Sequence, residues 1–490
     1  MPSALILNWA RTFFSILNFY PSSYSKMPAL VSIIQGSVDA IEKAVEAQSL
    51  EFPSLATPFT PQSEAARNLP EVAQASALLV SAATQLVAAA RSPEQSMTVV
   101  TFQHALSSAL RVAIEANVVE VLREAGPQGA HVNDIAQASN IDPSKLARVL
   151  RVLATNHIFT EVDPDVFTNN RLSSLIDTGK SVQSIKDSPE TKYIGTNGVC
   201  AGICHSTDEA FKACSYLPEV LLDPKTSKSD EPSETAFGKA FNFNGPIWEW
   251  FELPENAFKL TRFGLGMEGS KHAFPNAILE GFDWNGLKSG ALVVDVGGGV
   301  GAQCLTLAKN HPHLRFVVQD REPVVKEAVA VWDARFPNAV SSGQVVLQGH
   351  DFFTAEPVKN ADVFLLRMIL HDWSDKYCVK ILRNLRDAAM PSTRLLIVDS
   401  LIGYACADDS IKDIPGALLP SPPAPLLSNL GHTATIAYYL DMNMMELLNG
   451  KERTIAQFRE LLKETGWELV EVNHGVPGSL GGQKIIAVPA

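Results

Sequence analysis

The stretch VVDVGGGVG, residues 293–301, decides the fold. An apolar run over residues 292–296 predicts a buried strand, and Gly297, Gly298 and Gly299 follow it directly, with Gly301 opening a helix. Glycines are needed where a strand turns sharply into a helix and where a ligand meets bare backbone. The stretch therefore predicts a ligand-binding turn at the carboxyl end of a strand.

Apolar runs and helical segments alternate from residue 287 onward. The runs ALVVDV, RFVVQD, VVLQG, ADVFLLRMIL and RLLIVDSLI are separated by AQCLTLAKNH, VVKEAVAVWDARF and KILRNLRDAA. Such alternation is typical of a parallel, doubly wound sheet. We therefore expect an α/β, Rossmann-like domain over residues 286–490, interrupted by a Pro-rich insert at 404–432.

Three further segments precede this domain. Residues 1–95 form an N-terminal extension with helices and a Pro-rich linker, and residues 191–285 form a helical connecting region that is rich in aromatic side chains. Over residues 96–190 we expect a helix at 102–126, two more helices and a hairpin at 159–170, the outline of a winged helix. A DNA-binding regulator is one interpretation, but the acidic charge favours a structural or dimerising winged helix.

Composition limits the classes of partner. The chain has 490 residues, of which 46% are hydrophobic and 19% charged, and this predicts about two to four domains. Its net charge of −13 and the lack of a basic stripe argue against a nucleic-acid partner. Six cysteines in so long a chain form no disulfide framework, so a cytoplasmic location fits best. Cys200, Cys204 and Cys214 stand near His205 but lack paired zinc-site spacing, and we expect no metal site.

The amino-terminal segment is the part most similar to a membrane segment. Residues 4–20 are apolar and aromatic, but Arg11 lies in their middle, and no apolar run reaches the ~20 residues that a span needs. The segment fits a signal peptide poorly and leaves an interfacial helix or a partner-docking segment open. We expect no integral membrane span.

Acidic side chains follow the glycine turn at the ends of the next strands. Asp320 closes RFVVQD, where a carboxylate can accept both ribose hydroxyls of an adenosine-type ligand. Asp351 and Phe352 follow the third strand, where they can bind an adenine amino group and pack on its ring. The glycines also satisfy the dinucleotide pattern G-x-G-x-x-A, so a nicotinamide cofactor and an adenosylmethionine cofactor both remain possible at this stage.

The segment ADVFLLRMILHDWSD, residues 361–375, places two polar groups at the same edge. Arg367 lies in an apolar strand and should therefore meet a carboxylate, either an internal one or one of a ligand. His371 follows the strand with Asp372 beside it, and histidine can remove a proton near neutral pH. We expect His371 to be a general base and Asp372 to face the substrate.

Four motifs in this order resemble the plant- and fungal-type small-molecule O-methyltransferases. These are D-x-G-G-G-x-G from Asp295, G-H-D-F-F from Gly349, L-H-D-W-S-D from Leu370 and N-G-K-E-R-T from Asn449. The resemblance covers residues 100–490 and is strongest to the fungal enzymes of polyketide pathways. It implies a winged-helix domain that forms a homodimer, a Rossmann-like domain that binds S-adenosylmethionine, and in-line methylation of a phenolic hydroxyl on a small aromatic molecule.

The resemblance also implies roles for individual residues. His371 is the base, and Asp399 and Glu452 hold its imidazole, with Asp399 standing where plant relatives usually carry Glu. Met444 packs on the aromatic acceptor. The cofactor contacts fall on six residues: Gly297, Gly299, Asp320, Asp351, Phe352 and Arg367.

Two other functions compete with methyl transfer. A nicotinamide-dependent oxidoreductase explains the glycines but neither the H-D-W nor the K-E-R-T segment. A non-catalytic protein, in which the winged helix binds a partner and the cofactor site is vestigial, conflicts with the intact motifs.

Overall fold

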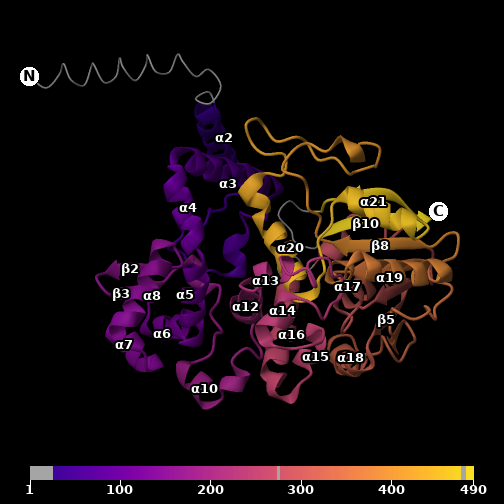
Figure 1. The fold of residues 1–490 in the computed structure, drawn as a ribbon, viewed down its shortest axis with the longest axis horizontal. Coiled ribbons are helices and arrows are strands. Elements are labelled where there is room, and N and C mark those ends of the chain that lie inside the picture. The colour runs from indigo at the N-terminus through magenta and orange to yellow at the C-terminus, as the bar shows by residue number, and fades with distance from the viewer. Residues whose placement is uncertain (1–25, 273–275, 476–481) are drawn as a thin grey trace, which may run out of the picture.

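The computed structural model describes residues 26–272, 276–475 and 482–490. The apolar segment 4–20 lies outside them. Helices dominate the amino-terminal half and a mixed sheet the carboxyl-terminal half, with α20 (Thr435–Leu448) running between the two (Figure 1).

The amino-terminal extension is a helical hairpin. Helices α2 (Lys26–Ala47) and α3 (Pro70–Ala90) pack through Ile41 and Val45 on one side and Val72 and Ala75 on the other. Among the described helices, α3 is the one that is long and apolar enough, by length and composition, to cross a membrane. The predicted linker joins the two helices and contains η1 (Pro61–Glu64).

The next domain combines short helices with a three-stranded sheet of order β1-β3-β2. Asp142 caps the amino terminus of α8, where its Oδ1 accepts from the Lys145 N–H at 3.0 Å. The predicted hairpin is confirmed as β2 and β3. The elements are α4 (Pro93–Phe102), α5 (His104–Glu115), α6 (Val118–Ala125), β1 (Ala130–His131), α7 (Val132–Ser139), α8 (Pro143–Thr155), β2 (Phe159–Asp163) and β3 (Val166–Asn169).

The single helix expected over residues 102–126 is wrong. The chain forms α5 and α6 instead, and Asn117 between them has a φ of +54°. Asparagine tolerates this left-handed conformation better than most residues, and one such residue ends a helix. The break turns α6, so that Val118 and Leu122 enter the same core as Ala113.

Short helices connect this domain to the large sheet. They enclose an aromatic cluster of Phe237, Trp250 and Phe251, against which Met444 of α20 packs. Their bounds are α9 (Arg171–Ser174), α10 (Val182–Asp187), α11 (Val199–His205), a π-helical turn η3 (Ser206–Ala210), α12 (Phe211–Cys214), α13 (Leu217–Leu221), α14 (Ala236–Phe241), α15 (Ile247–Phe251) and α16 (Ala257–His272), with 3-10 turns η2 (Pro189–Thr191), η4 (Pro254–Asn256) and η5 (Ala277–Leu279).

The large sheet has seven strands in the order β6-β5-β4-β7-β8-β10-β9. The first five are parallel, as the alternation predicted: β4 (Leu292–Val296), β5 (Arg315–Asp320), β6 (Val345–Gly349), β7 (Val363–Arg367) and β8 (Arg394–Asp399). The last two, β9 (Trp467–Asn473) and β10 (Gln483–Pro489), form an antiparallel pair. Only nine residues join them, too few for the crossover that a parallel pair requires.

Two helical layers cover this sheet. Helices α17 (Ala302–Asn310) and α18 (Glu322–Arg335) pack on one face, and α19 (Asp375–Ala388) and α21 (Ile455–Glu464) on the other. Because the five strands β6, β5, β4, β7 and β8 are parallel, their carboxyl ends all lie at one edge of the sheet. That edge is where such sheets bind ligands.

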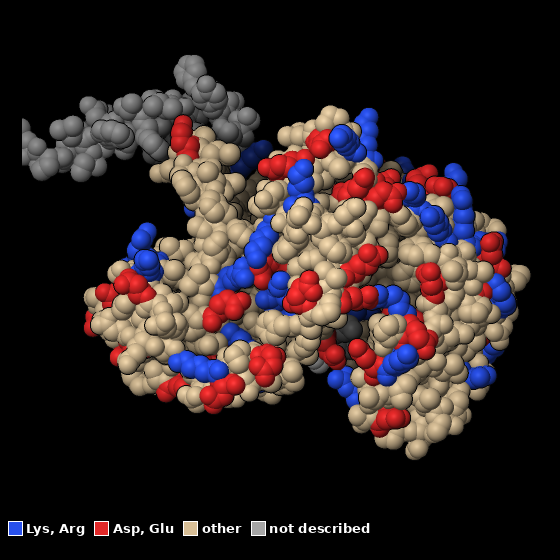
Figure 2. All heavy atoms as spheres, turned by 60° about the horizontal axis from the view of Figure 1, so that its bottom comes forward, with Lys and Arg blue, Asp and Glu red and all other residues tan. Residues whose placement is uncertain are grey.

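The surface carries no single dominant charge on the face that Figure 2 shows. Acidic and basic side chains are interspersed over both halves of the molecule there. This face offers no continuous basic stripe of the kind that tracks a phosphate backbone.

Candidate active site

The turn after β4 has the geometry that its glycines predict. Gly297 has a φ of +69°, and a Cβ built on it would lie 2.7 Å from Ile369 Cδ1 and 3.5 Å from the Phe352 ring. Only glycine fits such a position without strain. The Gly299 N–H donates to Asp320 Oδ2 at 2.8 Å, which joins the first and second strand ends. The structure thus brings Gly297, Gly299, Asp320 and Phe352 together.

The third strand end supplies an aromatic wall. Phe352 stacks edge-on against Phe353 and Trp373, with ring centroids 4.8 and 6.0 Å away. Asp351 is exposed, and its Oδ1 accepts from the Phe353 N–H at 3.0 Å. This carboxylate is therefore open to solvent at the sheet edge.

Arg367 ends β7 at the same edge. Burial lowers the pKa of its guanidinium, and the carboxylates of Asp295 and Asp399 oppose this shift without cancelling it. Two internal carboxylates therefore act on Arg367 through their charge.

His371 lies in the 3-10 turn η6 (Leu370–Asp372), immediately beyond β7. Its side chain is 8% exposed, and Nδ1 lies 2.8 Å from Glu452 Oε1, whose own side chain is fully buried. Nε2 lies 3.4 Å from Asp372 Oδ1. Because a carboxylate only accepts, the contact to Glu452 fixes the Nδ1–H tautomer in the neutral ring.

Three carboxylates set the charge of this imidazole. Burial alone lowers the pKa of His371, but Asp372, Glu452 and Asp399 outweigh it and raise that pKa to about 9. For the carboxyl groups of Asp372 and Asp399, burial acts in the opposite direction and raises the pKa of each to about 6. The cluster therefore favours a positive charge in its midst.

Asp399 acts on His371 only through its charge. Both of its carboxylate oxygens, and Oε2 of Glu452, are buried without a hydrogen-bond partner among the described residues. The expected contact between Asp399 and the imidazole is thus absent in this conformation. Buried carboxylate oxygens of this kind leave hydrogen-bonding capacity unused at the site.

Met444 belongs to α20, a helix that contacts the turn η6. It is buried in the aromatic cluster of the connecting helices. The same helix carries Asp441, whose Oδ1 accepts from the Glu452 N–H at 2.8 Å. Helix α20 therefore joins the aromatic cluster to the partner of His371.

Sequence reasoning missed the residues that hold His371 and Glu452 together. Gly450 approaches so closely that a Cβ on it would lie 2.1 Å from His371 O. The Lys451 N–H donates to that same oxygen at 2.9 Å. Arg453, 1% exposed, donates to Leu370 O and to Trp373 O at 2.8 Å each. The available signal was the motif itself, because each of these residues belongs to N-G-K-E-R-T.

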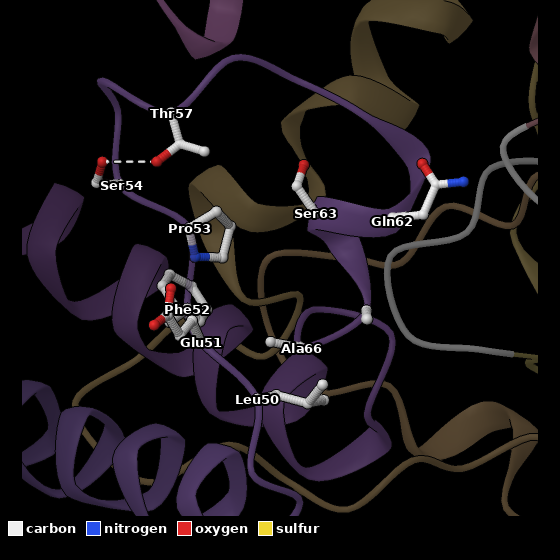
Figure 3. Close-up of a pocket in the computed structure, with 10 residues that line it drawn as sticks. Leu50, Glu51, Phe52, Pro53, Ser54, Thr57, Gln62, Ser63 and Ala66 are labelled. Atoms are coloured by element: carbon white, nitrogen blue, oxygen red, sulfur yellow. Dashed lines mark hydrogen bonds between the residues drawn. The ribbon is translucent and has the colours of Figure 1, made fainter.

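The cavity beside the Pro-rich linker lies apart from this edge, whereas two cysteines do not: Cys378 Sγ donates to Leu370 O at 3.2 Å, and Cys304 Sγ donates to Asp295 Oδ2 at 3.3 Å. All six cysteines are free, Cys204 accepts from Tyr193 Oη at 3.0 Å, and no group of three or more metal-ligating side chains occurs in the described ranges. A cavity of about 390 Å³ opens beside the Pro-rich linker, between Leu50 and Ala66 (Figure 3). It contains none of the predicted site residues.

Comparison with known proteins bears on the whole chain. Residues 221–414 match the model of an O-methyltransferase domain, and residues 99–178 match an O-methyltransferase dimerisation domain. An O-methyltransferase of Armillaria gallica is 43% identical over 95% of this chain and 99% of its own length. A 4-O-methyltransferase of Phanerochaete chrysosporium is 42% identical over 95% of this chain and 100% of its own.

Solved structures agree on the fold. The structure of LepI in complex with S-adenosylmethionine superposes with a TM-score of 0.62 at 20% identity, over 88% of this chain and 96% of that one. The glycine turn with Asp320, and the three carboxylates around His371, fit a cofactor that has an adenosine and a positively charged sulfonium. The family matches exclude the alternative of a nicotinamide-dependent oxidoreductase. The chain belongs to the plant- and fungal-type O-methyltransferases, enzymes whose cofactor is S-adenosylmethionine.

Proposed function

We propose that this enzyme methylates a phenolic hydroxyl of an aromatic small molecule, with His371 as the general base. The contact of His371 Nδ1 with Glu452 Oε1 at 2.8 Å is the observation that carries the proposal. It directs Nε2 away from Glu452 and stabilises the imidazolium that forms when Nε2 takes a proton. Asp399 assists through its charge.

An aromatic acceptor fits the surroundings of α20. Met444 shares its cluster with Phe237, Trp250 and Phe251, and a thioether packs well on a flat ring. Asp372, beside His371 Nε2, is within reach of a further hydroxyl of such an acceptor. The name of the Phanerochaete relative, a 4-O-methyltransferase, is in line with an oxygen acceptor.

The strand ends would hold the cofactor. We assign the ribose hydroxyls to Asp320, the adenine to Asp351 and Phe352, the backbone approach to Gly297 and Gly299, and the amino-acid carboxylate to Arg367. When bound there, the cofactor would supply an electrophilic methyl group to the acceptor oxygen. The residues of the chain supply alignment, worth up to ~7–11 kcal/mol in well-oriented systems, and proton removal.

The raised pKa of His371 couples the base to the cofactor. A base must be neutral to accept a proton, yet a pKa of about 9 keeps the imidazole protonated at neutral pH. A second positive charge beside it would disfavour the imidazolium and lower this pKa. Cofactor binding would thus release the base for use.

We also propose a homodimer through the outer face of α4. The element order helix, strand, helix, helix, hairpin over α6 to β3 fits the expected winged helix, within the segment that matches a dimerisation domain. Helix α4 has no buried residue, and Met97, Val100 and Phe102 are each more than 60% exposed. A patch of large apolar side chains of this kind marks an interaction surface.

Replacing His371 by Ala should lower kcat at least 100-fold, because base catalysis contributes ~10²–10⁴-fold. The affinity for S-adenosylmethionine should stay within about threefold, since the strand-end contacts remain. Methyl transfer to a panel of phenols and calorimetric cofactor binding measure the two quantities. His311→Ala, at the opposite edge of the sheet, serves as the control. Undiminished turnover by His371→Ala would refute the base.

The charge of the cofactor should set the pKa of His371. We expect a pKa near 9 in the free enzyme, little change with neutral S-adenosylhomocysteine, and a value at least one unit lower with S-adenosylmethionine. NMR titration of the imidazole, with His371→Gln to assign its signal, gives all three values. Equal values with the two ligands would contradict a sulfonium adjacent to the base.

Charges placed on α4 should dissociate the dimer. Phe102→Glu combined with Met97→Glu should convert a dimer to a monomer at micromolar concentration, because two buried charges would face each other across the twofold axis. Light scattering after gel filtration measures the mass. Val329→Glu, at an exposed position of α18, should leave the dimer intact. A monomeric wild-type chain would overturn the proposal.

A further inference from the structure

The α2–α3 hairpin and the insert at 404–432 bind each other. The hairpin lies outside both matched domains, and most of the insert lies beyond the end of the second match. Ser81 of α3 is 4% exposed, and its Oγ lies 2.6 Å from Leu430 O and 2.7 Å from Thr433 Oγ1. Thr433 Oγ1 in turn donates to Ala77 O at 2.8 Å. One turn further along α3, Gln85 Nε2 donates to Pro425 O at 3.0 Å.

The insert is fastened to α20 at both of its ends. Tyr438, in the first turn of α20, donates its hydroxyl to Gly403 O. The same hydroxyl accepts from Asn429 Nδ2 at 2.8 Å. The insert is therefore bonded to both α3 and α20; in Figure 1 it is the orange loop that extends beyond the upper end of α20.

The contact with α3 lies directly at the start of α20. Thr433 belongs to the 3-10 turn η8 (Gly431–Ala434), and α20 begins at the next residue. Leu430 just before this turn has a φ of +62°, a conformation that a leucine adopts only where surrounding contacts impose it. The bonds from Ser81 to Leu430 O and from Thr433 to Ala77 O thus tie α3 to the residues that immediately precede α20.

Helix α20 transmits this placement to the reacting groups. Its Asp441 accepts from the Glu452 N–H at 2.8 Å, and its Met444 lies in the aromatic cluster. Neither contact involves the glycine turn or Asp320. A shift of α20 would therefore change the acceptor side of the site and leave the cofactor side in place.

We infer that Ser81 and Thr433 are positioning residues for the acceptor: the amino-terminal hairpin holds the insert, and through it α20, against the site. The inference rests on the proposed function only in naming the acceptor as the molecule that α20 contacts. It assigns a shared task to two segments of the chain that contain no reacting group.

The chain offers a matched control for this inference. Thr84 lies one turn from Ser81 on α3. Its hydroxyl donates to Val80 O within the same helix and bonds to no residue of the insert. Ser81→Ala and Thr433→Val should raise the KM for a phenolic acceptor about fivefold, the effect expected from one lost hydrogen bond. The KM for S-adenosylmethionine should stay within about twofold, and Thr84→Val should change neither value.

Hydrogen exchange provides a readout without turnover. Amides of residues 425–442 should exchange several-fold faster in Ser81→Ala and in Thr433→Val than in the wild type or Thr84→Val, because the segment loses its attachment. Unchanged exchange in both variants would overturn the inference. Faster exchange with an unaltered acceptor KM would also overturn it, because the contact would then stabilise the fold without positioning the acceptor. If no phenol is methylated at all, the proposed function fails, whereas the exchange result still decides whether α3 holds α20.

Discussion

The contact between residues 450–453 and the turn after β7 is the constraint on which the site depends. Arg453 is almost completely buried, a costly position for a guanidinium unless its donors are used. It donates to Leu370 O, Trp373 O and Asp375 Oδ1, each at 2.8 Å. These bonds fix the backbone on both sides of His371. Glu452, the residue before Arg453, is thereby held at 2.8 Å from the imidazole although the two lie 81 residues apart.

Glycine at position 450 makes this contact possible. Any side chain there would collide with His371 O, to which the Lys451 N–H donates. The backbone of the segment therefore lies directly against the backbone of the turn. The bond from Lys451 N–H to His371 O places the side chains of Glu452 and Arg453, which follow it. A looser approach would leave Glu452 buried without its partner, which costs more than the contact itself contributes. The same segment is bonded to α20, because the Glu452 N–H donates to Asp441 Oδ1. The proposed base and the helix that we propose to contact the acceptor are thus held by the same segment.

The sequence predicted the parts of the site that arise locally. Glycine after a buried strand, and a carboxylate at the end of the next, follow from backbone geometry, and Gly299 and Asp320 do meet. Asn117 could not be predicted as a break, because an isolated asparagine in an apolar helical pattern is compatible with an unbroken helix until tertiary packing selects the left-handed conformation. The missing bond between Asp399 and His371 depends on a difference of one methylene in reach, which a motif does not specify. The attachment of the insert to Ser81 joins residues about 350 positions apart, and no local pattern records it.

The two halves of the site thus differ in how they are built. The cofactor half consists of strand ends of one sheet, where neighbouring strands are bound in a fixed register and a few residues after each strand suffice. The acceptor half, as we propose it, is assembled from α12, α14 and α15 of the connecting region and from α20, which lies far along the chain and meets them only through packing. Substitutions in those helices can alter the shape of the acceptor pocket without disturbing the sheet. Relatives that share the strand-end motifs can therefore share a cofactor and a base while the helices select different acceptors, and the insert held by α3 adds one more place where that selection can change.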